Sequence, residues 1–352
     1  MAKEKRAEEK ITGKSGADIF KGKDILVTGG CGSIGLEIVR QLLKHDPLRV
    51  RVFDHDESGH FRINQEIKSD KIRNLIGSVT DKDRINRAMQ GVDIVFHAAA
   101  LKHVPFCEYN PFEAVHTNVV GTQNVVDAAI NNNVKILVGI STDKAVNPIN
   151  TMGATKLLGE KIITNAPSGF STCKFCCVRF GNVLNSVGSV IPIFKKQIAD
   201  GGPVTVTSDK MTRFFMSMDE AVSLVLKTAE ITRGGETFIL KMNALKVIDL
   251  AQVMIEEMAP RCNRDPKKMK IEIIGVRPGE KIDEGLMTKE EADYMIETKD
   301  MLVLYNSILC NYGKGIIPAD RKQSNHLDYN SGNIPLLSKE DIRKKLYEKK
   351  II

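Results

Sequence analysis

The architecture of this chain follows from the stretch Asp24-Ile25-Leu26-Val27-Thr28-Gly29-Gly30-Cys31-Gly32-Ser33-Ile34-Gly35. Its apolar first half predicts a buried strand, and residues 36–43 continue with the spacing of an amphipathic helix. The predicted order is therefore strand, glycine-rich turn and helix. The glycines fit the pattern G-x-G-x-x-G when counted from Gly30, and G-x-x-G-x-x-G when counted from Gly29.

A turn of this kind is typical of dinucleotide binding. Backbone without side chains can approach a pyrophosphate closely, and the N-terminus of the next helix offers N–H groups and a positive dipole end. Any tight turn recruits glycine, but the flanking strand and helix favour the cofactor interpretation. The predicted cofactor-binding positions in the turn are Gly29, Gly32, Ser33, Ile34 and Gly35.

A carboxylate stands where the cofactor ribose should lie. The next predicted strand, residues 49–53, ends at Asp54, roughly 20 residues beyond the turn. An acid at this point binds the ribose hydroxyls of NAD and repels the 2′-phosphate of NADP; the alternative is that it only caps the following helix. Asp54 favours NAD, while Arg51, His55 and Arg62 are close enough in sequence to keep NADP open.

Strand and helix patterns alternate up to residue 140. Further strands are predicted at 71–79, 92–97 and 136–140, and a long helix at 112–131. This alternation predicts an α/β fold with a Rossmann-type doubly wound parallel sheet.

Small residues follow the strand at 92–97. Ala98 and Ala99 would let a cofactor lie close to the backbone, and His97 is interpreted as a structural residue at the strand end. Lys102 and His103 come next, on a loop that could bring them to the same site.

Polar chemistry appears where the strand at 136–140 ends, in the run Ser141-Thr142-Asp143-Lys144-Ala145-Val146-Asn147-Pro148. Pro148 blocks a helix before it, so we expect the triplet Thr142–Lys144 on a loop and a helix from Asn150 or Thr151. Ligands of open parallel sheets bind beyond the carboxyl ends of the strands. A carboxylate and an amine at that edge predict catalysis.

A smaller lobe should follow the polar loop at residues 181–192, which breaks the alternation. Arg213 and Arg277 are expected on loops there; arginine suits bidentate phosphate contact, although either could instead form a surface ion pair. The predicted organisation is a charged extension at 1–19, an NAD(P)-binding Rossmann domain at 20–182, a smaller α/β substrate lobe at 183–330 with some return to the first domain, and a peripheral tail helix within 331–352.

Composition narrows the class of protein. The 352 residues carry 51 Lys and Arg against 44 Asp and Glu, a net charge of +7 without a basic stripe interleaved with aromatics. This balance argues against nucleic acid and suits a basic cleft for an anionic substrate. No apolar run reaches the length of a membrane span and no signal core opens the chain, so we expect no membrane partner and a cytoplasmic location.

Three cysteines, Cys173, Cys176 and Cys177, lie close together. The run at 175–180 reads as a buried strand, in which cysteine acts as a small hydrophobe. No second Cys or His cluster completes a zinc set, so no metal site is predicted.

These motifs together resemble an extended short-chain dehydrogenase/reductase of the nucleotide-sugar branch, and more narrowly the UDP-N-acetylglucosamine 4,6-dehydratase family. The matching runs, in family order over residues 20 to 300, are Thr28–Gly35, His97–Pro105, Ser141–Pro148, Arg179–Leu184, Met211–Arg213 and Arg277–Lys281. The second and third runs are specific to this group, whereas the glycine motif is widespread.

The resemblance implies dehydration of a UDP-sugar without net redox change. Hydride leaves sugar C4 for NAD(P), water is eliminated across C5 and C6, and the hydride returns to C6. By resemblance Lys144 is the C5 base, Asp143 the C6 acid, Thr142 a hydrogen-bond partner near O4, and Lys156 the residue that holds the nicotinamide ribose. The implied substrate-binding positions are Lys102, His103, Asn182, Val190, Arg213, Arg277 and Glu280, and a homo-oligomer is usual in the family.

The residue at one position differs from that of the wider superfamily, in which a Tyr stands four residues before the lysine that corresponds to Lys156. Here that position is Met152, which has no proton to exchange. Some dehydratases of this group also carry Met, so another residue must accept the O4 proton. We expect Asp143 to accept the O4 proton, directly or through Thr142, and then to donate this proton to the departing C6 hydroxyl. Asp143 and Lys144 should not form a close ion pair while substrate is bound, because catalysis needs a protonated acid and a neutral base.

Two other functions stay open. A nucleotide-sugar 4-epimerase would need a base at the Met152 position and no C5 base. A non-catalytic NAD(P)-binding sensor or scaffold would tolerate Met152 but leaves Thr142, Asp143, Lys144 and Lys156 unexplained.

Overall fold

The computed structural model describes residues 18–166, 172–184, 188–306 and 329–352. The predicted charged extension therefore lies outside the described residues up to position 17.

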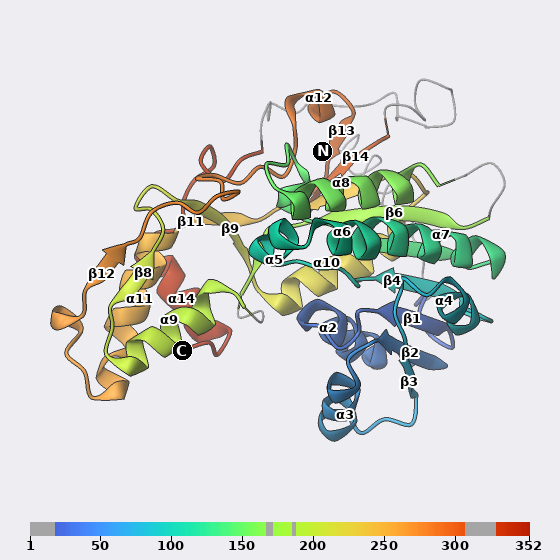
Figure 1. The fold of residues 1–352 in the computed structure, drawn as a ribbon, viewed down its shortest axis with the longest axis horizontal. Coiled ribbons are helices and arrows are strands. Elements are labelled where there is room, and N and C mark those ends of the chain that lie inside the picture. The colour runs from blue at the N-terminus through green and yellow to red at the C-terminus, as the bar shows by residue number, and fades with distance from the viewer. Residues whose placement is uncertain (1–17, 167–171, 185–187, 307–328) are drawn as a thin grey trace.

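A nine-stranded sheet forms the centre of the larger part of the molecule (Figure 1). In spatial order its strands are β13 (Met295–Glu297), β14 (Met301–Leu304), β10 (Thr237–Leu240), β6 (Lys174–Arg179), β5 (Ile136–Ile140), β4 (Ile94–His97), β1 (Asp24–Thr28), β2 (Arg49–Asp54) and β3 (Ile72–Ile76). Neighbours from β3 to β10 run parallel, and β14 and β13 add an antiparallel edge. The order β3-β2-β1-β4-β5-β6 confirms the predicted Rossmann-type sheet.

Helices cover both faces of this sheet (Figure 1). One face carries α2 (Ser33–Leu42) and α10 (Met218–Ile231), and the other carries α4 (Lys82–Ala88), α7 (Gly121–Asn131) and α8 (Thr151–Thr164). Strand residues alternate between the two cores: Val138 and Cys176 pack with α2 and α10, Leu137 and Cys177 with α7 and α8. The buried-strand interpretation of the cysteine run is thereby confirmed.

The long helix predicted at 112–131 is present in three consecutive segments. It consists of α6 (Pro111–Val115), a π-helical turn (His116–Val120) and α7, and it follows α5 (Val104–Tyr109). Other short elements are α3 (Glu57–Glu66), α12 (Lys289–Ala292) and 3-10 turns at Leu43–His45, Asp143–Ala145, Pro260–Cys262 and Pro266–Lys268.

A smaller lobe has its own core of buried side chains. Its elements are β7 (Asn182–Val183), α9 (Val190–Asp200), β8 (Val204–Val206), β9 (Thr212–Met216), β11 (Asn243–Lys246), α11 (Val247–Met258), β12 (Ile271–Ile273) and α14 (Lys339–Glu348). The predicted tail helix is present as α14, and its residues Ile342 and Leu346 are fully buried against α11 while most of its other side chains are exposed. The chain also returns to the large sheet at β10, β13 and β14.

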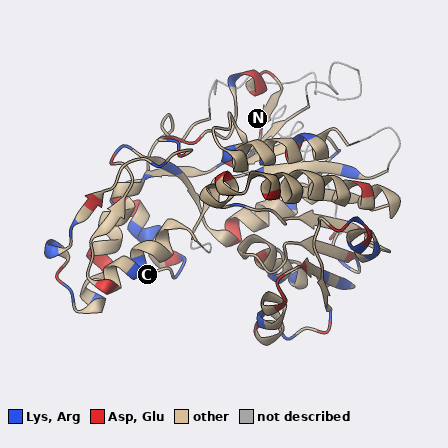
Figure 2. Cartoon of the chain, in the orientation of Figure 1, with Lys and Arg blue, Asp and Glu red and all other residues tan. Residues whose placement is uncertain are grey.

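Acidic and basic side chains are interspersed over both parts of the chain (Figure 2). Within the residues that the structure describes, no helix combines the length and apolar character needed to cross a membrane.

Candidate active site

The predicted catalytic triplet lies at the carboxyl end of β5. Thr142 caps a 3-10 turn at Asp143–Ala145, accepting a hydrogen bond from the backbone N–H of Lys144. The turn replaces the loop that was predicted, because one tight turn still fits before Pro148. Helix α8 then starts at Thr151, as predicted, with Asn150 as its N-cap.

The carboxylate of Asp143 contacts the side chains of both other members of the triplet. The hydroxyl of Thr142 donates to Oδ1 of Asp143 at 2.6 Å, and Nζ of Lys144 lies 3.1 Å from Oδ2 of the same carboxylate. Asp143 is 1% exposed. The expected separation of Asp143 from Lys144 concerns the substrate-bound enzyme and stays a prediction.

A second carboxylate, Glu284, belongs to this cluster, although it lies 140 positions after Lys144 in the sequence. Its Oε1 lies 3.0 Å from Nζ of Lys144 and 3.2 Å from Nε of Arg213, and Nδ2 of Asn182 donates to its Oε2 at 2.7 Å. Glu284 also shares a hydrogen bond with Asp143. Arg213 lies in β9 and not on a loop, and it also donates to the carbonyls of Thr212 and Ile282.

The charged groups of this cluster shift one another's pKa values. Burial raises the pKa of Asp143, but Lys144 and the hydrogen bonds from Glu284 and Thr142 outweigh it and hold the pKa below its usual value. Burial lowers the pKa of Lys144, yet the two carboxylates raise it above normal. Burial, and then Asp143, raises the pKa of Glu284 to about 7. Of the two carboxylates, Glu284 is thus the one that is easier to protonate.

Lys156 lies on α8, one turn beyond Met152. Its Nζ donates to the carbonyl of Ile140 at 2.6 Å, and burial lowers its pKa. Met152 itself is 3% exposed and packs in an apolar cluster with Cys107 and Ala114. The position that usually supplies a tyrosine hydroxyl is therefore an apolar packing position here.

The glycine turn after β1 fits a dinucleotide. Gly29 has φ +65°, and a Cβ there would lie 2.6 Å from the backbone N of Ala99. A Cβ on Gly35 would lie 2.2 Å from the carbonyl O of Gly29. Gly32 is the N-cap of α2, where no side chain caps the helix, and a Cβ there would meet only the carbonyl of Gly29. Open space at an uncapped helix start suits a pyrophosphate.

Asp54 stands at the end of β2 and already has backbone partners. It accepts hydrogen bonds from the N–H of Cys31 at 3.0 Å and of Asp56 at 3.1 Å, so it also braces the glycine turn. Arg51, one of the residues that kept NADP open, pairs with Asp24 at 2.7 Å.

His97 connects β1 to α7, in agreement with its structural interpretation. Its Nδ1 lies 2.7 Å from the hydroxyl of Thr28, and its Nε2 3.0 Å from that of Thr122. Asn118 holds the next loop by bonding both the N–H and the carbonyl of Leu101.

The remaining predicted substrate residues lie on other segments and are exposed or partly exposed. Lys102 and His103 are exposed, and a Cβ on Gly188 would lie 2.7 Å from Cε1 of His103. Partial burial lowers the pKa of each, with Lys102 adding to the shift of His103. Val190 begins α9. Arg277 is exposed, and its backbone N–H donates to Glu280, whose carboxylate lies 3.5 Å from Arg213.

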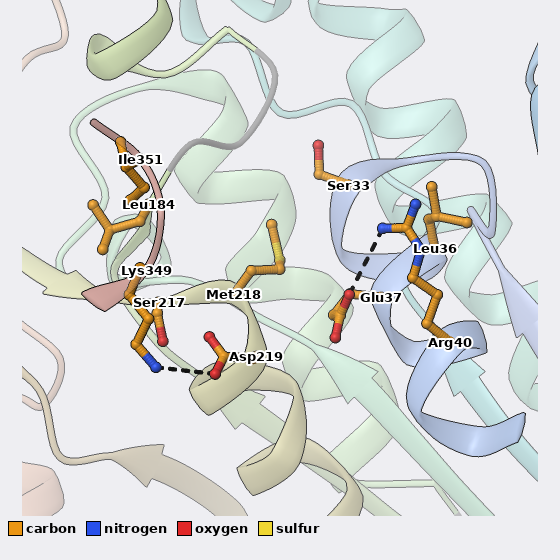
Figure 3. Close-up of a pocket in the computed structure, with 10 residues that line it drawn as sticks. All are labelled: Ser33, Leu36, Glu37, Arg40, Leu184, Ser217, Met218, Asp219, Lys349 and Ile351. Atoms are coloured by element: carbon orange, nitrogen blue, oxygen red, sulfur yellow. Dashed lines mark hydrogen bonds and ion pairs between the residues drawn. The ribbon is translucent and has the colours of Figure 1, made fainter. Parts of the chain in front are cut away.

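A cavity of about 360 Å³ lies between α2, α10 and the chain end at Lys349 and Ile351 (Figure 3). Ser33 opens onto it from the predicted dinucleotide turn, and Leu184 from the segment after β7. Figure 3 shows two ion pairs on its walls, Glu37 with Arg40 and Asp219 with Lys349. The triplet Thr142–Lys144 does not line it.

Sequence reasoning missed Glu284 and its neighbour Lys281, whose Nζ donates to the carbonyl of Val146. The available signal was the position of Glu284, four residues after Glu280 and just beyond the motif Arg277–Lys281. This position could not be interpreted without the knowledge that Glu284 contacts Lys144 in the folded chain.

Comparison with known proteins places the chain among sugar-nucleotide enzymes. Residues 25–306 match the family described as Polysaccharide biosynthesis protein. The chain is 52% identical to an uncharacterized membrane protein of Methanocaldococcus jannaschii over 94% of this chain and 97% of that protein. It is 40% identical to the inverting UDP-N-acetylglucosamine 4,6-dehydratase of Campylobacter jejuni, over 82% of this chain and 85% of the relative.

Two further likenesses cover almost the whole chain. A UDP-glucose 4-epimerase of Rickettsia akari is 39% identical over 93% of this chain and 96% of the relative. The crystal structure of Pen from Bacillus thuringiensis superposes with a TM-score of 0.88 at 42% identity, covering 95% of this chain and 99% of that one. The chain therefore belongs to the polysaccharide biosynthesis protein family, the family of the UDP-N-acetylglucosamine 4,6-dehydratases.

Proposed function

We propose that the chain catalyses the NAD(P)-dependent 4,6-dehydration of a UDP-N-acetylhexosamine, with UDP-N-acetylglucosamine as the first candidate, to a UDP-4-keto-6-deoxy sugar. The observation that carries this proposal is the hydrogen-bonded set of hydroxyl, carboxylate and amine at Thr142, Asp143 and Lys144. This set follows the carboxyl end of β5, and the glycine turn follows the carboxyl end of β1. The two strands are parallel and are separated in the sheet only by β4. Relatives that bear the dehydratase name support it.

When bound, NAD(P) would supply the hydride transfer from C4 to C6, and Asp54 favours NAD. The residues that would hold it are Gly29, Gly32, Ser33, Ile34, Gly35, Asp54, Ala98, Ala99 and Lys156. Within the chain, Asp143 takes the O4 proton, directly or through Thr142, and gives it to the departing C6 hydroxyl. Lys144 takes the C5 proton and later returns one to C5. The homo-oligomer is part of the proposal, and light scattering would test it.

Incubation of the purified protein with NAD and UDP-N-acetylglucosamine, followed by NMR of the product, tests this function. The expected product is a 4-keto-6-deoxy sugar nucleotide, which also reveals retention or inversion at C5. The double variant Asp143→Asn, Lys144→Ala should form none, and full turnover by that variant would refute the assignment.

A 4-epimerase is the second candidate, favoured by the likeness to the Rickettsia akari enzyme. The same NMR experiment separates the two, because an epimerase product keeps its C6 hydroxyl and only inverts C4. A non-catalytic sensor would bind NAD(P) and leave the sugar unchanged.

A further inference from the structure

We infer that Glu284 is the group that takes a proton from Lys144 and so makes it a base, and that Glu284 returns this proton at the end of each cycle. This role rests on the proposed dehydratase function. Glu284 acts through Lys144 and is a positioning residue in that sense.

The geometry of the cluster carries this inference. Nζ of Lys144 lies between two carboxylates, 3.1 Å from Oδ2 of Asp143 and 3.0 Å from Oε1 of Glu284. The side chain of Glu284 is only 4% exposed, so water is a poor competitor for the proton. A lysine held by two anions is a poor base, because both stabilise its ammonium form. Catalysis must therefore remove negative charge or supply an acceptor.

The cluster provides both the removal of negative charge and a proton acceptor. In the proposed reaction, Asp143 is neutralised when it takes the O4 proton, which leaves Glu284 as the anion facing Lys144. Lys144 can then pass one proton from Nζ to Oε1 over a hydrogen bond that already exists. A neutral amine and a neutral carboxylic acid result, and no net charge has moved out of the cluster.

The protons balance over the whole cycle. The neutral amine of Lys144 takes the C5 proton and becomes ammonium, while Asp143 gives its proton to the C6 hydroxyl and water departs. The ammonium then protonates C5, and Glu284 returns its stored proton to Lys144. The cluster ends with the same three protonation states in which it began.

Several groups hold Glu284 in place and set when it is ionised. Asp143 and Lys144 face it from the 3-10 turn, and Asn182 from β7. Arg213 faces it from β9, and Lys281 contributes its charge from the preceding segment. When Glu284 carries a proton and shares it with the Asp143 carboxylate, it cannot accept one from Lys144, so this protonated pair is the inactive form.

The substitution Glu284→Gln tests the role, since glutamine keeps the shape and loses the acceptor. We expect kcat to fall about 100-fold with little change in KM. Reduced nicotinamide should accumulate in a single turnover, because C4 oxidation proceeds and elimination stalls. In the wild type, kcat should rise with pH around a pKa near 7, the value to which burial raises Glu284. That rise should vanish in the variant.

Two further variants keep the test decisive. Glu284→Asp retains a carboxyl group and should recover part of the rate together with the rise near neutral pH. Glu272→Gln, the same change at an exposed position in β12, should match the wild type. An active wild type whose Glu284→Gln variant keeps its rate and pH profile overturns the role of Glu284 alone. A wild type that dehydrates no UDP-hexosamine overturns the proposed function itself.

Discussion

The hydroxyl of Thr142 donates a 2.6 Å hydrogen bond to Oδ1 of Asp143, an oxygen that Nζ of Lys144 also approaches to 3.2 Å. One carboxylate is thus connected to the group expected near O4 of the sugar and to the group expected near C5. With Met152 buried and without an exchangeable proton, this connection gives the O4 proton a route to Asp143.

Replacing Thr142 by valine keeps the side-chain shape and removes that donor. We expect kcat for dehydration to fall about 100-fold while KM for the UDP-sugar stays similar, because the hydroxyl serves proton transfer more than binding. Steady-state kinetics with NMR product analysis checks this. Thr205→Val in β8 is the matched control, and equal rates in the two variants would contradict the relay.

Replacing Gly35 by alanine should abolish cofactor binding. The new Cβ would lie 2.2 Å from the carbonyl O of Gly29, so the turn has to open. Isothermal titration with NAD should show affinity falling below detection. A melting temperature close to that of the wild type would show that the turn, and not the whole fold, has changed. Unaltered NAD affinity would argue that the pyrophosphate lies elsewhere.

Replacing Arg179 by alanine should cost about 3–5 kcal/mol of unfolding free energy, because it leaves the buried carboxylate of Glu160 without its cationic partner. Nε of Arg179 donates to Oε2 of Glu160 at 2.9 Å, and Nη2 contacts Glu291 at 2.7 Å; Arg179 is 1% exposed. Urea unfolding measures the difference. Arg343→Ala removes a surface ion-pair set of α14 and should cost about 1 kcal/mol or less. Equal losses would mean that burial does not set the cost.

The unfolding free energy should fall as the solution becomes acidic, in part through His97. Burial, with a smaller contribution from Lys156, lowers the pKa of His97 from 6.5 to about 3. Between these values the unfolded chain binds a proton that the folded chain excludes, so stability present above pH 6.5 is lost as pH falls, by up to ~1.4 kcal/mol per pH unit. His97→Gln should flatten this slope.

Urea unfolding at several pH values checks the slope. His55→Gln is the control, because its side chain is 83% exposed. A His97→Gln variant that remains as acid-sensitive as the wild type would show that other groups set the slope.

Local pattern was enough to predict the parts of the site that lie within a few residues of each other in sequence. The order of apolar run, glycine turn and helix at residues 24–42 is what the structure shows, and so is the start of α8 after Pro148. Both depend on neighbours along the chain: glycine permits the turn, and proline delays the helix.

Long-range contacts explain what the sequence did not reveal. Glu284 touches Lys144 although 140 positions separate them, and no periodicity records such a contact. The charged face of α14 suggested a surface helix, whereas two residues on its other face, Ile342 and Leu346, are fully buried. Arg213 was expected on a loop, but pairing of β9 with β11 places it in a strand.

The pairing of β6 with β10 has a consequence for how the polypeptide is made. Residues 180–236 intervene, and they include α9, β8 and β9. While the ribosome synthesises them, one edge of β6 has no partner, and an open edge strand of this kind is a template for wrong pairing with other nascent chains. The parallel part of the central sheet cannot be completed until residue 240 has emerged, so the nascent chain is exposed to wrong pairing at β6 throughout this interval.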